Sequence, residues 1–465
     1  PYGFRDPVGA LRTLSLIGHL VSIVMALFVI LGAWWAAREI WDDRTGVMAA
    51  LLTMVSYPMF YYSRTGNVDV PMMAFAAIAM AAYARALQVA MSTRVAVILG
   101  AAVGAALATK EQALGLFLAM APVLLVVHLR REWRAGRRGP IAWKTPMLAL
   151  AVALLAFGLG SGLLVDPTRF FAHLAHAQER MELARSGALT FIPTYPRTWD
   201  GHLDLALLLG GFMAQAMTLP GLALAGVGIA LVAWRDRRSL LLLLPAVSYL
   251  ALLYFATRTG QLRYLMPATF VLGLFAARAV ILAGESRHRT LRLAGVASAA
   301  LVLGLGLLRG VDLTWAMVKD SRHAAAAWIA AEARPGDRLE YFGSAYKLPA
   351  LPEHLTVAVA TPHRGPLVAL RRDDAAAAEI AAGWRDRQPR FILVAPDWSS
   401  QGNEPHSGSL PPQLFAQLDR GELGYRLAAT FQSPALLPWV RRPALDYPMV
   451  NIPVRVFVRV GGTQP

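Results

Sequence analysis

Cysteine is absent from this sequence of 465 residues, and charged side chains make up only 16% of it. The absence of cysteine excludes disulfides, thiolate metal sites and cysteine nucleophiles. Hydrophobic residues account for 56% of the chain, and the mean hydropathy is +0.46. A soluble protein cannot cover so much apolar surface, so the composition predicts an integral membrane protein.

Several common catalytic and cofactor motifs are missing as well. There is no glycine-rich phosphate loop, no HExxH sequence and no cluster of His and Asp at metal-ligand spacing. His173 and His176 are three residues apart on an expected helix. Such a pair without a third ligand is more often a solvated helix face than a metal site. The sequence therefore predicts no cofactor and no metal ligand set.

Acidic residues are scarce compared with basic ones. The chain has 29 Asp and Glu against 45 Lys and Arg, which gives a net charge of +16. Nucleic acid is one partner that such a charge could serve. A membrane protein that keeps its arginines on the cytoplasmic face explains the charge better. We therefore expect the lipid bilayer as a partner, and no nucleic acid.

Ten apolar segments approach the roughly 20 residues that a membrane-spanning helix requires. They are Leu11–Trp35, Gly46–Tyr62, Pro71–Val89, Val95–Ala108, Gln112–Leu129, Thr145–Val165, Leu219–Trp234, Ser239–Ala256, Tyr264–Gly284 and Leu291–Arg309. The run from Val95 to Leu129 is too long for one span, so it is divided at Thr109–Gln112. The pattern predicts a polytopic α-helical membrane protein with about ten spans.

The loops between these segments differ in their content of Lys and Arg, which indicates the orientation. If the first segment starts outside, the inner loops are 36–45, 84–94, 129–144, 235–238 and 285–292, and they hold sixteen basic residues. The short outer turns hold only Arg64, Lys110, Arg258 and Arg263. We therefore expect the basic loops in the cytoplasm.

The apolar segment Leu203–Thr218 is not counted as a span, because counting it would place every later basic loop outside. A long helix bent near Pro220, or a half-buried interfacial helix, fits better. Asp166–His202 is then an outer loop with a helix around Phe170–Met181.

Beyond residue 310 the composition changes to that of a soluble α/β domain, so the chain divides into a membrane domain at 1–310 and a second domain at 311–465. Ten spans of which the first starts outside also end outside, so this second domain is expected outside the cytoplasm. Its expected elements are helices at Arg322–Ala333 and Asp373–Trp384 and strands at Arg338–Phe342, Thr356–Ala360, Arg390–Val394, Tyr425–Phe431 and Val454–Val460. Gln401–Pro412 is rich in Gly, Ser and Pro and is expected to be a loop.

The expected outer face carries charges at the ends of apolar helices. Arg64 and Asp69 share a polar turn, Lys110 is followed by Glu111, and a later turn holds Arg258, Arg263 and Tyr264. A charge inside a span costs about 2.5–3.5 kcal/mol or more, so such residues face water or a site. Snorkelling anchors are an equally open interpretation of any one of them.

Charge in every short outer turn raises the odds of a shared anionic ligand. A phospholipid head group is one candidate, and the phosphate of a polyprenyl-phosphate sugar is the other. Lys offers such a phosphate a point charge and Arg a bidentate fork. Cations there would stabilise charge that grows on the phosphate as the sugar leaves.

Four motifs occur in an order that resembles a known family. They are the paired spans of Leu11–Tyr62 joined by the turn Ala37–Gly46, the run Tyr62-Ser63-Arg64 followed by Asp69-Val70-Pro71, the turn Ala108-Thr109-Lys110, and Arg263-Tyr264-Leu265-Met266-Pro267. Together they are similar to the GT-C superfamily of membrane glycosyltransferases. The resemblance is greatest to its bacterial protein-mannosyltransferase-like group, which includes the aminoarabinose transferase of lipid A. It covers roughly residues 1–310.

The resemblance implies an inverting enzyme of the bacterial inner membrane. It would move a sugar from a polyprenyl-phosphate carrier to an extracytoplasmic protein, lipid or glycan. Lys110 and Arg263 would meet the lipid phosphate, with Arg64 and Tyr264 as helpers. Asp69 matches a second acidic position that supports the pocket. Glu111 and Arg258 complete the expected substrate-binding set, and a divalent metal, known in the superfamily at large, is not demanded here.

Two departures from the family pattern affect the expected mechanism. The family has Lys-Gly where this chain has Lys110-Glu111. Its principal acidic residue lies in the first outer loop, whereas this sequence begins at Pro1 without an initiator methionine or a signal-peptide pattern, and Pro1–Pro7 resembles the tail of that loop. We expect the natural gene to add a span and a loop that carries the general base upstream of Pro1. Residues 1–465 alone should then catalyse no turnover.

Two alternatives to this transferase remain open. One is a non-enzymatic translocator of lipid-linked glycans or an assembly factor. A transporter is expected to show internal repeats and broken helices with polar groups at the membrane midplane, and the sequence indicates neither. The other is a glycan ligase or polymerase, which would also use a lipid-linked donor.

Overall fold

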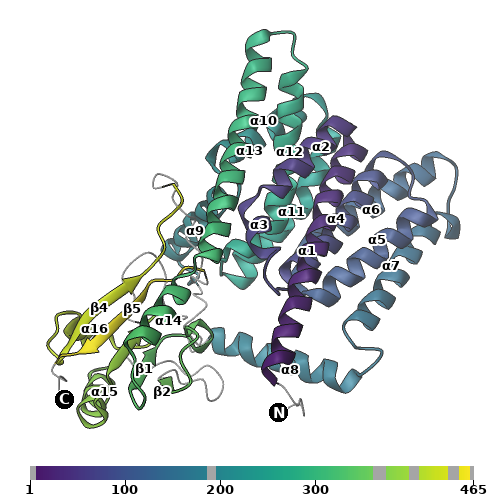
Figure 1. Cartoon of the computed structure of the whole chain (residues 1–465). Coiled ribbons are helices and arrows are strands. Elements are labelled where there is room, and N and C mark those ends of the chain that lie inside the picture. The colour runs from purple at the N-terminus through teal and green to yellow at the C-terminus, as the bar shows by residue number, and fades with distance from the viewer. Residues whose placement is uncertain (1–6, 186–194, 360–372, 397–407, 438–449, 461–465) are drawn as a thin grey trace. The chain divides into compact units, whose positions relative to one another are not determined.

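The structure is a computed structural model that describes residues 7–185, 195–359, 373–396, 408–437 and 450–460 (Figure 1). The chain divides into two compact units. The helical unit comprises Pro1–Glu179 and Thr194–Gly310, and the sheet unit comprises Arg180–Pro193 and Val311–Pro465.

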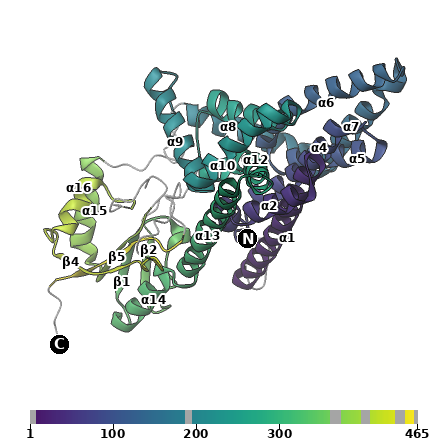
Figure 2. The same ribbon diagram turned by 90° about the horizontal axis from the view of Figure 1, so that it is seen from above.

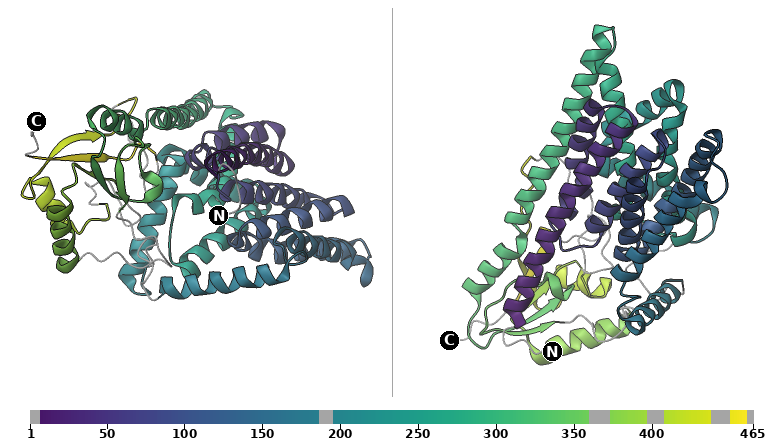
Figure 3. Two further views of the ribbon diagram at one scale, coloured as in Figure 1. Left: turned by 60° about the horizontal axis from the view of Figure 1, so that its bottom comes forward. Right: turned by 90° about the vertical axis from the view of Figure 1, so that its right-hand side faces the viewer.

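Helices, most of them long and apolar, form the first part of the chain, as the hydropathy predicts. They are α1 (Pro7–Ile40), α2 (Asp43–Met54), α3 (Tyr57–Tyr62), α4 (Asp69–Gln88), α5 (Thr93–Thr109), α6 (Leu114–Arg134), α7 (Pro140–Gly160), α8 (Pro167–Arg185), α9 (Trp199–Met217), α10 (Leu219–Arg235), α11 (Leu243–Ala251), α12 (Met266–Gly284) and α13 (Arg289–Val318). Short turns of other helix types join some of them, namely η1 (Glu111–Ala113), η2 (Arg237–Leu242), the π-helix η3 (Leu252–Thr257) and η4 (Leu262–Leu265). The first helix, α1, packs along α2 and α4 (Figure 3).

The predicted membrane-spanning architecture is confirmed, but the predicted number of ten spans is not. In the described part of the chain, seven helices are long and apolar enough to cross a membrane, or eight if one bent pair is counted as a span. The helix expected at Gly46–Tyr62 breaks after Met54. Pro58 explains the break, because it lacks the N–H that a continuous helix would donate to the carbonyl of Met54. The segment expected at Val95–Ala108 forms α5, which has 17 residues.

The bent pair is α9 and α10, which meet at an angle of 98°. Thr218 joins them with a φ of 65°, and its hydroxyl caps α10 by accepting the N–H of Gly221 at 3.3 Å. A left-handed conformation is rare for threonine. The expectation of a helix bent near Pro220 is therefore the alternative that the structure shows.

Glycines let α5 and α7 lie in close contact, as Figure 2 shows. A Cβ atom at Gly104 would come within 2.3 Å of the Ala153 carbonyl oxygen, and one at Gly100 would come equally close to that of Ala149. Small residues spaced by four allow helix backbones to approach in this way. The packing holds α5 in place, and α5 ends at the site described below.

Arginines satisfy the carbonyl groups at the end of α4, which the helix itself leaves unpaired. Arg131 donates to the Ala86 carbonyl at 2.6 Å and also to those of Leu87 and Val89, and Arg238 donates to Leu87. Positive charge at a helix C-terminus also interacts favourably with the helix dipole. Both arginines belong to the loops predicted to face the cytoplasm.

The sheet unit contains a mixed five-stranded sheet in the order β2-β1-β3-β5-β4. Its strands are β1 (Arg338–Phe342), β2 (Thr356–Val359), β3 (Phe391–Val394), β4 (Tyr425–Phe431) and β5 (Val454–Arg459), and its helices are α14 (Ser321–Glu332), α15 (Asp374–Arg387) and α16 (Pro412–Asp419), with a short turn η5 (Ala345–Lys347). β1 pairs in parallel with β2 and β3, and β5 is antiparallel to β3 and β4.

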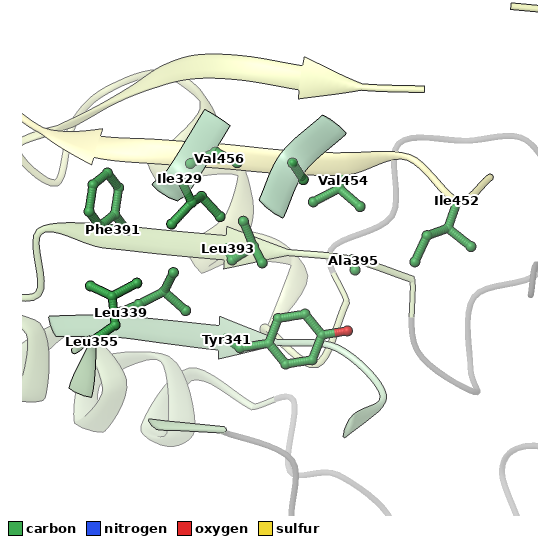
Figure 4. Close-up of a cluster of buried hydrophobic side chains, with 11 residues drawn as sticks. Ile329, Leu339, Tyr341, Leu355, Phe391, Leu393, Ala395, Ile452, Val454 and Val456 are labelled. Carbon is green, nitrogen blue, oxygen red and sulfur yellow. The ribbon is translucent and has the colours of Figure 1, made fainter. Parts of the chain in front are cut away.

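Alternating side chains of these strands form a core on each face of the sheet. On one face Ile329 of α14 packs over Leu339, Leu393 and Val456 (Figure 4). On the other face, helices α15 and α16 cover Ile392 and Phe457. This alternation is what a period-two pattern predicts. The predicted α/β architecture of this region is therefore present. Val460 lies outside β5, and Ala360 and residues 401–407 of the expected loop lie outside the described residues.

Candidate functional site

The site contains a buried carboxylate, that of Asp69. Asp69 is the first residue of α4, and its side chain is only 3% exposed. Its backbone N–H donates to Asn67 Oδ1 at 2.6 Å, which fixes the turn that leads into the helix. Burial of a carboxylate is costly unless the charge is paired. The partners of Asp69 therefore define the site.

Two cations from distant parts of the sequence pair with Asp69. Lys110 Nζ donates a hydrogen bond to Asp69 Oδ1, and Arg263 Nε lies 3.8 Å from Asp69 Oδ2. Lys110 is an extended residue between α5 and η1, where the apolar run was expected to divide. Arg263 lies in η4, just before α12. The side chains of Lys110 and Arg263 are 15% and 23% exposed, so both remain accessible to a ligand.

A tyrosine ring lies beside both cations. Lys110 Nζ is 4.8 Å from the centre of the Tyr264 ring, and the guanidinium carbon of Arg263 is 5.5 Å from it. A ring face within about 6 Å attracts a cation. Tyr264 is itself buried, at 8% exposure. The ring therefore adds a favourable contact for both cations beside the Asp69 carboxylate.

The cluster of Asp69, Lys110, Arg263 and Tyr264, called here the Asp69 cluster, carries a surplus of positive charge. Two cations share one carboxylate, which leaves a net charge of one. Burial lowers the pKa of the Lys110 ammonium, whereas the Asp69 carboxylate acts to raise it. An anionic ligand would supply the missing countercharge. Lys and Arg together suit a phosphate group, the first as a point charge and the second as a fork.

Tyr249 is a neighbour of this cluster that the sequence reasoning missed. The residue is fully buried in α11 and interacts electrostatically with Asp69 and Tyr264. Its hydroxyl has no hydrogen-bond partner among the described residues. Buried tyrosine hydroxyls usually have a partner. A single tyrosine in an apolar span gives no sequence signal of this placement.

Glu111 follows Lys110 in the sequence but points elsewhere. Its side chain is 80% exposed, and His173 Nε2 lies 3.6 Å from its carboxylate. His176 pairs with Glu179 instead, also at 3.6 Å. Among the residues that the structure describes, no group of three or more His, Asp or Glu side chains could hold a metal ion.

Arg64 lies in the turn between α3 and α4, with its guanidinium 4.1 Å from the centre of the Phe60 ring. Burial lowers the pKa of this guanidinium. The residue is half-buried. Its position at the entrance to α4 keeps it a candidate helper, separate from the pairs that define the Asp69 cluster.

Arg258 makes its hydrogen bonds to the chain that leads into α9. It is buried, adopts a left-handed conformation and donates to the carbonyls of Tyr195, at 2.7 Å, and Pro196. His202 Nδ1 lies 3.4 Å from it. These contacts indicate that Arg258 fixes the start of α9 against the turn after η3. They leave less of its guanidinium for a substrate than the sequence prediction supposed.

Comparison with known proteins gives one family match. Residues 15–158 match the family model of dolichyl-phosphate-mannose-protein mannosyltransferases. The matched segment contains Asp69 and Lys110, and Arg263 lies outside it. The match confirms the resemblance to protein mannosyltransferases over this part of the chain. No curated protein matches the sequence.

Several solved structures align with this chain at low sequence identity and low TM-score. The oligosaccharyltransferase of Archaeoglobus fulgidus, in a complex with zinc and sulfate, is 13% identical with a TM-score of 0.41, over 95% of this chain and 77% of that chain. ArnT from Cupriavidus metallidurans bound to undecaprenyl phosphate is 15% identical with a TM-score of 0.41, over 94% of this chain and 83% of that chain. The arabinofuranosyltransferase AftD from Mycobacteria is 18% identical with a TM-score of 0.37, over 100% of this chain and 36% of that chain.

Proposed function

We propose that this protein is a membrane glycosyltransferase that moves a sugar from a polyprenyl-phosphate carrier to an acceptor outside the cytoplasm. The observation that carries the proposal is the Asp69 cluster, in which two accessible cations share one buried carboxylate at the ends of apolar helices. An amphiphile with a phosphate head fits such a site. The family match over residues 15–158 supports the class of reaction.

In the proposed reaction, Lys110 and Arg263 bind the phosphate of the donor. The bond between the anomeric carbon and the phosphate oxygen breaks as the acceptor oxygen attacks from the opposite side, which inverts the configuration. The leaving phosphate gains negative charge, and the two cations stabilise it. The acceptor hydroxyl passes its proton to a base. The products are therefore the glycosylated acceptor and free polyprenyl phosphate.

Asp69 is best suited to position the cations. Its carboxylate is almost fully buried and already contacts both Lys110 and Arg263. A general base must reach the hydroxyl whose proton it takes. We therefore propose Asp69 as a positioning residue, which agrees with the supporting role that the family resemblance gives it.

The structure also contains a feature that favours the translocator alternative. α9 and α10 form a sharply broken pair at Thr218, and broken helices line the substrate sites of many transporters. The two functions predict different products. A transferase releases free polyprenyl phosphate, whereas a translocator leaves the lipid-linked sugar intact.

An assay of the natural full-length protein in proteoliposomes separates these outcomes. We expect a polyprenyl-phosphate sugar to be converted to polyprenyl phosphate in the presence of a suitable acceptor, and chromatography of the extracted lipid measures it. A panel of donor sugars and of protein, lipid and glycan acceptors identifies the pair used. If intact donor moved between leaflets and no donor were converted to polyprenyl phosphate, the protein would be a translocator and the transferase proposal would be wrong.

We further propose that the site faces away from the cytoplasm of a bacterial inner membrane, with residues 311–465 on the same outer side. A reporter fused at Gly136, in the basic loop between α6 and α7, should then be active only in the cytoplasm. Paired cytoplasmic and periplasmic reporters at this position measure the orientation. Activity of the periplasmic reporter alone would reverse the topology and move the Asp69 cluster to the wrong face for an extracytoplasmic acceptor.

A further inference from the structure

The helical unit contains a cavity that is lined by residues other than those of the Asp69 cluster. It encloses about 40 Å³ and lies among α1, α2, α3, α4, α9, α10, α12 and α13. One water needs about 10–15 Å³ of such space, so the cavity has room for a few waters or one small group. Its wall is mostly apolar, and the residues with polar side-chain atoms are Thr53, Ser56, Tyr57, Thr218, Thr269 and Arg309.

Arg309 is the charged side chain of this wall. It belongs to α13, an apolar helix of membrane-spanning length, and it is half-buried. One guanidinium nitrogen donates to the Gln215 carbonyl at 3.1 Å. Among the described residues, no carboxylate forms an ion pair with Arg309. Arg309 is the last residue of the expected span Leu291–Arg309, and a cation at the end of a span faces water, a lipid head group or a ligand site.

A buried hydroxyl lies on the same wall without a partner. Thr53 is 5% exposed, and its Oγ1 has no hydrogen-bond partner in the described structure. The amide oxygen of Gln215, beside the Arg309 contact, is also buried without a partner there. Buried polar groups are normally satisfied by protein or by ordered water. In this described part of the chain, a buried hydroxyl without a partner and a cation without a carboxylate partner on the wall of one cavity indicate a ligand with acceptor oxygens.

Gly273 provides independent support for usable space. The residue is a buried member of α12 that lines the cavity, yet a Cβ atom placed on it would meet nothing within 4 Å. Gly306, which also lines the cavity, is tightly packed, because a Cβ there would lie 2.7 Å from the Val55 carbonyl oxygen. The opening at Gly273 is therefore a local property of the cavity.

We propose that this cavity binds the phosphate of an anionic membrane lipid, with the Arg309 guanidinium and the Thr53 hydroxyl as donors to its oxygens. The fork of an arginine matches a phosphate in two hydrogen bonds. A lipid is favoured over a free ion because α13 also presents exposed apolar side chains, including Leu301 and Leu307, along which acyl chains can lie. The proposal is independent of the glycosyltransferase function, since it involves no residue of the Asp69 cluster.

Lipid titration of the purified full chain in detergent tests the site. The probes are phosphatidylglycerol, phosphatidylcholine and inorganic phosphate, and the readouts are native mass spectrometry and thermal unfolding followed by tryptophan fluorescence. We expect one phosphatidylglycerol to bind more tightly than phosphatidylcholine and to raise the unfolding temperature. Inorganic phosphate should neither bind measurably nor raise the unfolding temperature. Equal binding of the two lipids, or site-dependent stabilisation by inorganic phosphate alone, would overturn the assignment to an anionic lipid.

Two matched pairs of variants locate the binding. Gly273→Leu fills the cavity, whereas Gly304→Leu places the same side chain on an exposed face of α13 that is also free of neighbours. Arg309→Gln removes the proposed donor, whereas Arg292→Gln removes an exposed arginine near the start of the same helix. We expect Gly273→Leu and Arg309→Gln to weaken phosphatidylglycerol binding about tenfold or more, with the control variants unchanged.

Because a cavity variant can fail to fold, Thr53→Val serves as a milder third test. It removes the hydroxyl with little change in shape and should weaken binding by a smaller factor than Arg309→Gln. Wild-type affinity in folded Arg309→Gln protein, or equal losses in the Gly304→Leu and Arg292→Gln controls, would show that lipid associates with the helix surface in general.

Discussion

Lys110→Ala is expected to lower sugar transfer by the natural full-length protein about ten- to over a hundredfold. The variant removes one charge-assisted hydrogen bond to the leaving phosphate, which is worth about 1.5–3 kcal/mol. Asp69 keeps Arg263 as a neighbour at 3.8 Å, so the cluster retains one ion pair. We expect the protein to stay folded. Turnover of the lipid donor, measured with a thermal unfolding curve for each variant, tests the prediction.

Three further variants separate charge at this site from charge in general. Arg263→Ala should lose transfer to a similar extent, because it removes the second cation of the cluster. Lys110→Arg keeps the charge and should retain more activity than Lys110→Ala. Lys144→Ala is the matched control, since Lys144 is an exposed lysine in α7. Near-normal donor turnover in both Lys110→Ala and Arg263→Ala would show that these residues are snorkelling anchors and do not bind the donor phosphate.

Much of the helix pattern could be predicted from the sequence because apolar length and charge act locally. The interruption of the apolar run around Lys110 is visible in Thr109–Gln112, and the structure ends α5 at Thr109 and begins α6 at Leu114. β1 and β4 have the predicted bounds, since their alternating residues pack on both faces of one sheet. Such signals depend on neighbours in the sequence.

The exact positions of helix breaks were harder to predict because hydropathy does not register them, although a bend near Pro220 was expected. The segment Gly46–Tyr62 is apolar throughout, yet Pro58 divides it into α2 and α3. The bend at Thr218 depends on one left-handed residue whose hydroxyl caps the next helix. Residues at both breaks line the cavity whose wall includes Thr53 and Arg309. A cavity is made by the packing of distant helices, so it leaves no direct sign in the sequence.

The candidate site was predicted in part because charges near span ends are few. Asp69, Lys110 and Arg263 were selected for that reason, and the structure brings them together with Tyr264. Arg258 met the same criterion, but the fold directs it to carbonyls before α9. Charge at a span end identifies a buried or interfacial group, while its partner depends on the turn that carries it.

Asp69→Asn is expected to cause the largest loss of stability among these variants. The substitution removes the one carboxylate that the described structure places between Lys110 and Arg263, so two nearby cations lose their shared countercharge. Removal of one partner from a buried ion pair typically costs about 3–5 kcal/mol. We expect a large fall in the unfolding temperature in detergent, accompanied by loss of transfer.

A double variant distinguishes the loss of countercharge from a general disruption of α4. Adding Lys110→Met to Asp69→Asn removes the unpaired ammonium and leaves Arg263 as the single charge of the cluster. If Asp69 acts mainly by neutralising Lys110, the double variant should be more stable than Asp69→Asn alone, and the double-mutant cycle should give a coupling energy within the roughly 0.5–3 kcal/mol seen for contacting residues. Transfer should remain lost, because the donor phosphate then meets one cation only.

Asp43→Asn is the control for this cycle. Asp43 also lies in the first turn of a helix, α2, but its side chain is 68% exposed and pairs with Arg38 at 3.6 Å. Exposed ion pairs contribute about 0–1 kcal/mol, so this variant should unfold close to the wild-type temperature. If Asp69→Asn were as stable as Asp43→Asn and fully active, the buried carboxylate would not be holding the two cations, and the Asp69 cluster would lose its assigned role in binding phosphate.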